Sequence, residues 1–154
     1  MNQQCNPPKK LPTGLSLIEL MVALVIIAIV SSVAYPSYQS QMAATRRADA
    51  QAVLIEAAQY MERFYTENNR YDQDTLGTAV ALPAQLTESP RDAGTKSYDI
   101  AVQASTASTY TLRATPKNNQ AGDGFLELTN SFTKSWDADN SGTIGAGEST
   151  WSKY

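Results

Sequence analysis

Residues 14–34 read GLSLIELMVALVIIAIVSSVA, and this stretch decides the architecture of the chain. The run from Leu15 to Ala34 spans 20 residues, and its only members that are not apolar are Ser16, Glu19, Ser31 and Ser32. A helix of that length measures about 30 Å, which matches the hydrocarbon thickness of a bilayer. The run therefore predicts one membrane-spanning helix over residues 15–34.

Glu19 is the one charged residue in this apolar run. A carboxylate inside a membrane segment costs several kcal/mol, on a scale where an Asp at the helix centre costs roughly 2.5 to 3.5 kcal/mol. By default such a residue marks a site that finds a positive partner. We therefore expect Glu19 to have a role beyond anchoring.

The residues around the start of the run resemble the processing motif of type IV prepilins. Gly14 is followed by an apolar residue, a small polar one, two apolar ones and then Glu19. The resemblance implies a leader over residues 1–14, a prepilin peptidase that cuts between Gly14 and Leu15, and methylation of the new amino group of Leu15. The cut also creates a cation, with which Glu19 of a neighbouring subunit could pair in a filament core.

The likeness extends past the motif. Tyr35-Pro36-Ser37-Tyr38, residues 63–71 and Ser89-Pro90 resemble the layout of minor pilins of the PilE type. The alternative is an ordinary secretory signal peptide, with Lys9 and Lys10 as its charged region and cleavage after Ala34. That alternative gives Glu19 no use.

The composition sets the length and the net charge that the chain would have after removal of its leader. Removal of residues 1–14 would leave 140 residues, enough for the anchor and one extracytoplasmic domain over residues 35–154. Because the leader holds two Lys and no acid, 10 of the 12 basic residues would remain against 15 acidic ones, and the formal net charge would move from −3 to −5. This charge disfavours non-specific nucleic-acid binding, although a local basic patch stays possible.

The reactive side chains are few. There is no His, and the only cysteine, Cys5, lies in the leader. Nucleophile and base pairs built on His or Cys are therefore excluded, and we expect no enzyme activity. The mature domain also has no disulfide, so other contacts must hold its C-terminal region.

Periodicity predicts an α+β pilin fold, with a long N-terminal helix packed on an antiparallel sheet of about four strands. Pro36 should kink the helix, because it lacks an N–H and clashes with the preceding turn. Beyond it, apolar residues at alternating spacings of four and three predict an amphipathic helix to about Asn69. Residues 72–96 are expected to form a long loop with one short helical turn, and strands are expected over residues 97–103, 109–115, 125–128 and 132–136.

Residues 137–148 match a calcium-binding loop of 12 residues. Ca²⁺ prefers six to eight hard oxygen ligands, and short side chains at alternate positions can converge on it. The ligand positions hold Asp137, Asp139, Ser141, Thr143 through its carbonyl, and Glu148. The competing interpretation is a polar surface hairpin without a metal.

The aromatic residues Tyr60, Phe64, Tyr65 and Tyr71 have helical spacing and are expected in the core. Trp136 and Trp151 flank the calcium-like loop and are expected to pack on the sheet. Arg46 and Arg47 are interpreted as a solvated face or as contacts to lipid headgroups.

Taken with the resemblance, these patterns predict a minor type IV pilin. Its precursor would cross the inner membrane once and would then enter an extracellular pilus on the cell surface. Its partners would be other pilin subunits, the prepilin peptidase and the pilus assembly machinery, and its role would be adhesion, twitching motility or DNA uptake. A type II secretion pseudopilin and a membrane-anchored or secreted calcium-binding module are the alternatives.

Overall fold

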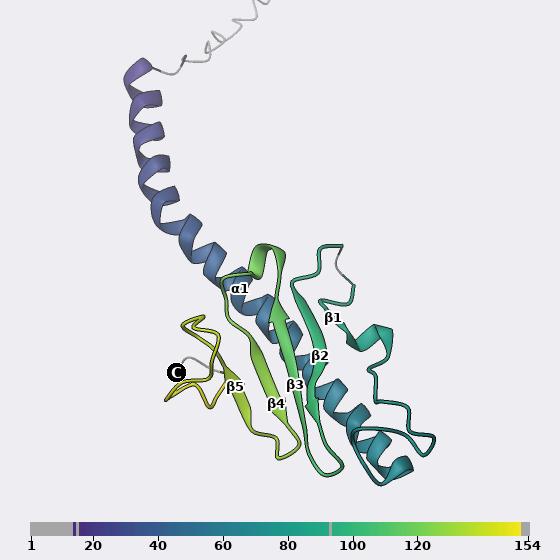
Figure 1. The fold of residues 1–154 in the computed structure, drawn as a ribbon. Helices are drawn as coiled ribbons and strands as arrows, with labels where there is room; N and C mark the ends of the chain where they lie inside the picture. The colour runs from purple at the N-terminus through teal and green to yellow at the C-terminus, as the bar shows by residue number, and fades with distance from the viewer. Residues whose placement is uncertain (1–13, 15, 93, 152–154) are drawn as a thin grey trace, which may run out of the picture. The chain divides into compact units, whose positions relative to one another are not determined.

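The computed structural model describes residues 14, 16–92 and 94–151 (Figure 1). By its internal contacts the chain divides into two units, Met1–Gln39 and Ser40–Tyr154, which we describe separately. Helix α1, Leu17–Asn68, contributes to both units. The predictions that concern Leu15 and residues 1–13 lie outside the described residues.

In the first unit, the N-terminal part of α1 is apolar and exposed. An 18-residue window of the helix has a mean hydropathy of 2.7, and none of that window is buried within the chain. By length and composition the helix is able to cross a membrane. Pro36 lies inside α1 and does not end it, and the kink expected at this residue stays a prediction.

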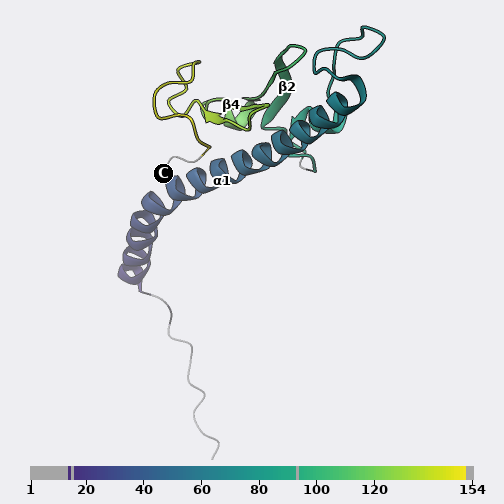
Figure 2. The same cartoon turned by 90° about the horizontal axis from the view of Figure 1, so that it is seen from below.

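The second unit is an antiparallel sheet on the C-terminal part of α1 (Figures 1 and 2). The sheet has five strands in the order β1-β2-β3-β4-β5, so each strand pairs with its neighbours in sequence. Their bounds are β1 Glu88–Ser89, β2 Tyr98–Ser105, β3 Tyr110–Pro116, β4 Leu126–Thr129 and β5 Lys134–Trp136. Two short 3-10 helices, η1 Ala84–Leu86 and η2 Asn118–Gln120, lie in the connections.

The core forms where one stripe of α1 meets one face of the sheet. The helix contributes small residues that allow close approach, together with Val53, Leu54 and Met61. The strands alternate, so that every second side chain enters the core. The buried apolar residues of the strands are Tyr98, Ile100, Tyr110, Leu112, Ala114, Leu126, Leu128 and Trp136.

The predicted α+β fold is therefore confirmed, with two corrections. The sheet has five strands rather than about four, because β1 spans only two residues inside the predicted loop and is too short to show alternation. The last strand begins at Lys134 rather than at Phe132, because Phe132 lies in a turn with a left-handed φ of 57°. The short helical turn expected in residues 72–96 is η1.

The ends of the elements have local causes. Helix α1 stops where Asn69 adopts a left-handed φ of 59° and donates its N–H to the Tyr65 carbonyl at 2.7 Å. Of the four aromatic residues expected in the core, three are there, whereas Phe64 is half-buried and its ring lies 6.4 Å from that of Tyr60. Tyr71 is buried, and Tyr60 and Tyr65 pack against the core.

Hydrogen bonds from both tryptophans hold the C-terminal region. The Trp136 indole donates to the Asp123 carbonyl at 2.7 Å, and the Trp151 indole donates to the Glu127 carbonyl at 3.1 Å. Gln51 of α1 donates to the Trp151 carbonyl at 3.3 Å. The expectation that these tryptophans pack on the sheet is confirmed, since Trp136 belongs to the core and Trp151 packs against it.

Candidate assembly, metal and binding sites

Gly14 and Glu19 lie at the start of α1. Gly14 is exposed, and an added Cβ would have no atom of the other described residues within 4 Å. The Glu19 N–H donates to the Ser16 carbonyl at 3.1 Å, and its carboxylate lies in the first helical turn, where the helix dipole favours negative charge. Its side chain is exposed, so it is open to a partner in another chain.

The acidic loop after β5 gathers the predicted metal ligands. Asp137 is 1% exposed, and its carboxylate accepts the amides of Ser141 at 2.8 Å and Gly142 at 2.9 Å. Gly142 has a φ of 85°, a conformation that glycine adopts without strain. The backbone of the loop is thus folded around the Asp137 side chain.

Glu148 closes the same loop from its far end. Its two oxygens accept the amides of Ala138 and Gly145, each at 2.7 Å. Ligand oxygens of Asp137, Asp139 and Glu148 lie within 4.8 Å of one another. The sequence interpretation placed these three carboxylates together, and the structure does so.

The remaining two predicted ligands complete an all-oxygen set. The Ser141 hydroxyl lies 3.4 Å from an Asp137 oxygen and 3.1 Å from the Thr143 carbonyl. Hydrogen bonds from the side chain and amide of Ser141 lower the pKa of the Asp139 carboxyl below its ordinary value. An exclusively oxygen donor set of this kind fits a hard cation such as Ca²⁺.

Arg47 is not on a solvated face, and that interpretation is wrong. Its guanidinium pairs with the Asp123 carboxylate through two hydrogen bonds, and the two side chains are 16% and 14% exposed. The Tyr98 hydroxyl donates to the same carboxylate at 2.6 Å, and the guanidinium lies 3.6 Å from the centroid of the Trp136 ring. Burial, followed by the bond to Asp123, raises the pKa of Tyr98.

Glu62 contacts two buried tyrosines, which helical spacing alone could not predict. Its carboxylate accepts the hydroxyls of Tyr71 and Tyr110, with contacts of 3.1 Å to each. Burial and then the hydrogen bond to Glu62 raise the pKa of Tyr71 to about 12. The signal missed in the sequence was a lone acid beside the apolar stripe of α1.

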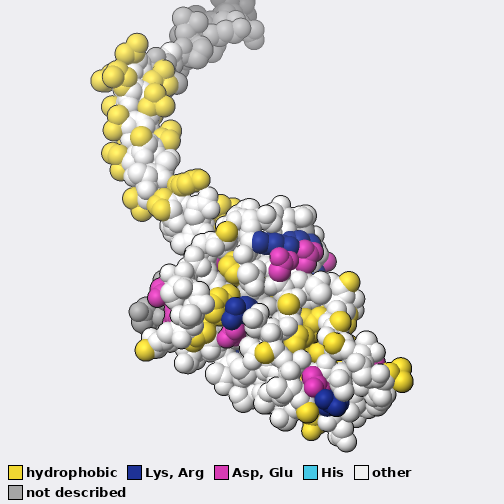
Figure 3. Space-filling model, in the orientation of Figure 1, with side chains coloured by type: hydrophobic (Ala, Val, Ile, Leu, Met, Phe, Trp, Pro, Cys, Tyr) yellow, Lys and Arg dark blue, Asp and Glu magenta, His cyan; other side chains and the backbone are white. Residues whose placement is uncertain are grey.

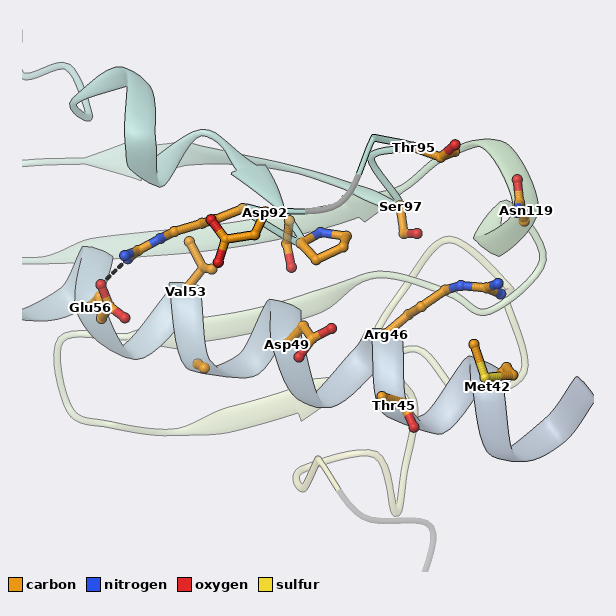
Figure 4. Close-up of a pocket in the computed structure, with 14 residues that line it drawn as sticks. Met42, Thr45, Arg46, Asp49, Val53, Glu56, Asp92, Thr95, Ser97 and Asn119 are labelled. Carbon is orange, nitrogen blue, oxygen red and sulfur yellow. Dashed lines mark hydrogen bonds and ion pairs between the residues drawn. The ribbon is translucent and has the colours of Figure 1, made fainter. Parts of the chain in front are cut away.

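A groove of about 730 Å³ runs along α1 beside the segment after β1 (Figure 4). Arg46 and Asp49 line it from the helix, and Arg91 pairs across it with Glu56. The buried Ser89 hydroxyl also lines it and has no hydrogen-bond partner among the described residues. Because acidic and basic side chains both line the groove, its electrostatic potential is neither uniformly positive nor uniformly negative.

The visible surface has the same character. Dark blue and magenta side chains lie in adjacent pairs rather than in one basic patch (Figure 3). Arg113 pairs with Glu127, and Lys117 pairs with both Glu88 and Asp99. Most cations described in the second unit are therefore neutralised locally.

A helix that is apolar and then amphipathic, packed on an antiparallel meander, defines a protein of the type IV pilin class. The family model described as "Type IV minor pilin ComP, DNA uptake sequence receptor" matches residues 36–129, and the model of the prokaryotic N-terminal methylation motif matches residues 11–35. The chain belongs to this family of type IV minor pilins. The family resemblance seen in the sequence is thereby confirmed, and the family is one of structural pilins rather than of enzymes.

Among solved structures, the crystal structure of the Neisseria meningitidis non-core minor pilin PilV is similar to this chain. The two are 21% identical with a TM-score of 0.48, and the match covers 69% of this chain and 97% of PilV. Comparison with curated protein sequences found no match.

Proposed function

We propose that this protein is anchored in the inner membrane as a precursor and is then assembled as a minor subunit into an extracellular type IV pilus. The observation that carries the proposal is the N-terminal part of α1, which is highly apolar, unburied within its own chain and marked by one carboxylate. An exposed apolar helix needs either lipid or neighbouring helices around it. The membrane would surround the helix with lipid before assembly, and the filament core would surround it with neighbouring helices afterwards.

Processing would occur between Gly14 and Leu15. A glycine at the cut leaves the peptide accessible, and the new amino group would place a positive charge beside the apolar helix. The Glu19 carboxylate of a neighbouring subunit would then neutralise that charge during assembly.

Mass spectrometry of the protein from sheared pili tests this proposal. We expect a mature chain that begins with an N-methylated Leu15, and Gly14→Val should leave unprocessed precursor in the membrane. Gly94→Val, in an exposed loop where an added Cβ has open space around it, is the matched control. A mature chain that begins at Tyr35 would instead establish an ordinary secretory signal.

Within the pilus, we propose DNA uptake as the role of this subunit. The support is the match of residues 36–129 to a family described as a DNA uptake sequence receptor. Since the surface charges are largely paired, binding would depend on specific contacts more than on a broad positive field.

A strain that lacks this chain separates the candidate roles. Natural transformation should fall while pili, twitching motility, adhesion and type II secretion remain. Loss of twitching or adhesion with normal transformation would assign one of those roles instead, and loss of exoprotein secretion would favour a pseudopilin.

We further propose that the loop of residues 137–148 binds Ca²⁺. The support is the ligand spacing together with the convergence of the three carboxylates. Asp137, Asp139, Ser141, Thr143 and Glu148 would hold the ion. The mature domain has no disulfide to hold its C-terminal region, and the bound ion would serve that purpose. The loop is in place to do so, because the Trp136 N–H of the edge strand β5 donates to the Glu148 carbonyl at 3.0 Å.

A further inference from the structure

The turn between β4 and β5 displays an aromatic ring. Phe132 is 54% exposed, although it sits in the folded domain and not in the membrane segment. The turn beneath it is tightly bonded, since the Phe132 N–H donates to the Thr129 carbonyl at 2.9 Å and the Thr129 hydroxyl accepts the Thr133 amide at 3.2 Å. The ring is therefore presented on a well-defined backbone.

The conformation of Phe132 is unfavourable for its residue type. Its φ of 57° lies in the left-handed region, where a bulky side chain costs free energy and glycine or asparagine does not. In hairpin loops the residue after such a turn is commonly glycine. Because the ring is largely exposed, packing offers little compensation, and an outlier of this kind points to function.

The surroundings of Phe132 suit an anionic partner. The β2–β3 turn lies at the same end of the sheet, since the Asn130 N–H donates to the Tyr110 carbonyl at 3.2 Å (Figure 1). Residues 100–112 contain no charged residue, and residues 128–136 contain only Lys134. In a chain with a formal net charge of −3, these two hairpin turns carry no acidic side chain.

We propose that Phe132 is the contact through which this protein grips duplex DNA, by inserting its ring between neighbouring base pairs. This inference rests on the DNA-uptake role proposed above. Apolar side chains enter the minor groove in this way, where they partly unstack a base step and kink the duplex. Lys134 would neutralise a neighbouring phosphate, and the side-chain amide of Asn130 would donate to the DNA backbone.

The chemistry selects duplex DNA through two features. An exposed ring on a turn can reach between base pairs, and the absence of carboxylates on the two turns removes repulsion from phosphates. Because Lys134 is the single cation on these turns, few counterions would be released on binding. The affinity should therefore depend only weakly on salt.

The test uses the full chain in non-ionic detergent and a pool of fluorescein-labelled 40-base-pair duplexes of random sequence. Fluorescence anisotropy gives the affinity, and duplexes with 2-aminopurine report unstacking of a base. Phe132→Gly should weaken binding by roughly 10- to 100-fold, the range of one lost stacking contact, and should abolish the unstacking signal. Its melting temperature should be unchanged or higher, because glycine relieves the left-handed strain.

Three further variants sharpen the test. Phe132→Leu, which keeps an apolar wedge, should retain part of the affinity. Lys134→Gln should reduce the slope of log affinity against log salt by about one. Leu76→Gly removes another exposed apolar side chain, which is 89% exposed in the turn of residues 74–78, and should leave DNA binding intact.

The outcomes separate this inference from the function on which it rests. If the unaltered chain binds no duplex, the DNA-uptake role is wrong. If the unaltered chain binds and Phe132→Gly binds equally well, the role stands and the wedge is overturned. Equal losses in Phe132→Gly and Leu76→Gly would also overturn it, because a specific contact requires the two to differ.

Discussion

At the scale of single residues, Glu19 is the clearest case of a charge kept where physics disfavours it. It stands in the first turn of an exposed apolar helix, and the N-terminal helix dipole offsets only part of the cost. A carboxylate in that place gains most when a cation of another chain meets it. Removal of the Glu19 carboxylate should therefore impair assembly rather than membrane insertion.

We expect Glu19→Val to insert into the membrane normally and to be depleted from pili. The substitution removes a membrane cost and deletes only the pairing. Immunoblots of sheared pili and of membranes measure the two pools. Ser32→Ala is the control, because its hydroxyl donates only within the helix, to Ile29 at 2.7 Å. A normal level of the Glu19→Val chain in pili would show that the pairing role is wrong.

Glu62 is a second residue whose charge has a measurable effect, because it helps to raise the pKa of Tyr71. Tyr71 loses its proton with difficulty, because burial and then the neighbouring carboxylate raise its pKa to about 12 from an ordinary value of 10.0. A group whose folded-state pKa is raised stabilises the fold fully below the unfolded pKa. That contribution is lost as pH rises from about 10 to about 12.

We therefore expect the free energy of unfolding to fall over this alkaline window. Glu62→Gln should lower the pKa of Tyr71 toward its ordinary value, although burial will keep it somewhat raised. Tyrosinate absorbance during a pH titration measures the pKa, and urea unfolding at each pH measures stability. Glu67→Gln, an exposed glutamate on the same helix, should change neither. An unchanged Tyr71 pKa in Glu62→Gln would show that burial alone causes the shift.

At the scale of elements, the loop of residues 137–148 packs along the edge strand β5 and is hydrogen-bonded to it. Edge strands expose unpaired backbone groups, and the backbone of this loop covers part of β5. A bound ion would tie Asp137, directly after β5, to Glu148 near the end of the chain. The loop would then be ordered by the ion as well as by its own hydrogen bonds.

We expect the full chain in detergent to melt at a higher temperature in calcium than in chelator. Binding only to the folded state stabilises it by mass action, by about 2.7 kcal/mol at a hundredfold excess over the dissociation constant. Asp139→Asn and Glu148→Gln should each remove most of the gain, whereas Asp92→Asn, an exposed acid outside the loop, should keep it. Tryptophan fluorescence follows the transition, since Trp136 and Trp151 flank the loop. Identical melting in calcium and chelator would favour the metal-free hairpin.

At the scale of the whole molecule, the Asp123 carboxylate joins parts of the second unit that are distant in sequence. The carboxylate pairs with Arg47 of α1 and accepts a hydrogen bond from Tyr98 of β2. The backbone carbonyl of Asp123 accepts a hydrogen bond from the Trp136 indole of β5. These contacts tie the C-terminal part of α1 to strands β2 and β5.

We expect Asp123→Asn to destabilise the folded domain by about 2 to 4 kcal/mol, because breaking a largely buried pair leaves the Arg47 charge uncompensated. Urea unfolding followed by tryptophan fluorescence measures the loss. Asp72→Asn is the control, since the Arg70 and Asp72 side chains are 37% and 27% exposed and their pair is local. Equal losses in the two variants would contradict a special role for Asp123.

The elements that sequence patterns could predict are those set by local periodicity. The apolar run, the amphipathic part of α1 and the four longer strands each repeat over several residues, and the metal-like spacing of residues 137–148 is also local. The two-residue strand β1 and the start of β5 were missed, because pairing and a left-handed turn residue, rather than alternation, decide them.

By itself the sequence determined the pilin class, the long apolar N-terminal helix, the lone carboxylate Glu19 and the candidate ligands, since each depends on residues close together in the chain. Only the tertiary structure decided that Arg47 is paired and that Glu62 serves two tyrosines. Arg47 and Asp123 are 76 residues apart, and Glu62 and Tyr110 are 48 apart. Such pairs carry no local signal, because they form only when a helix packs on a sheet and desolvates the polar groups between them.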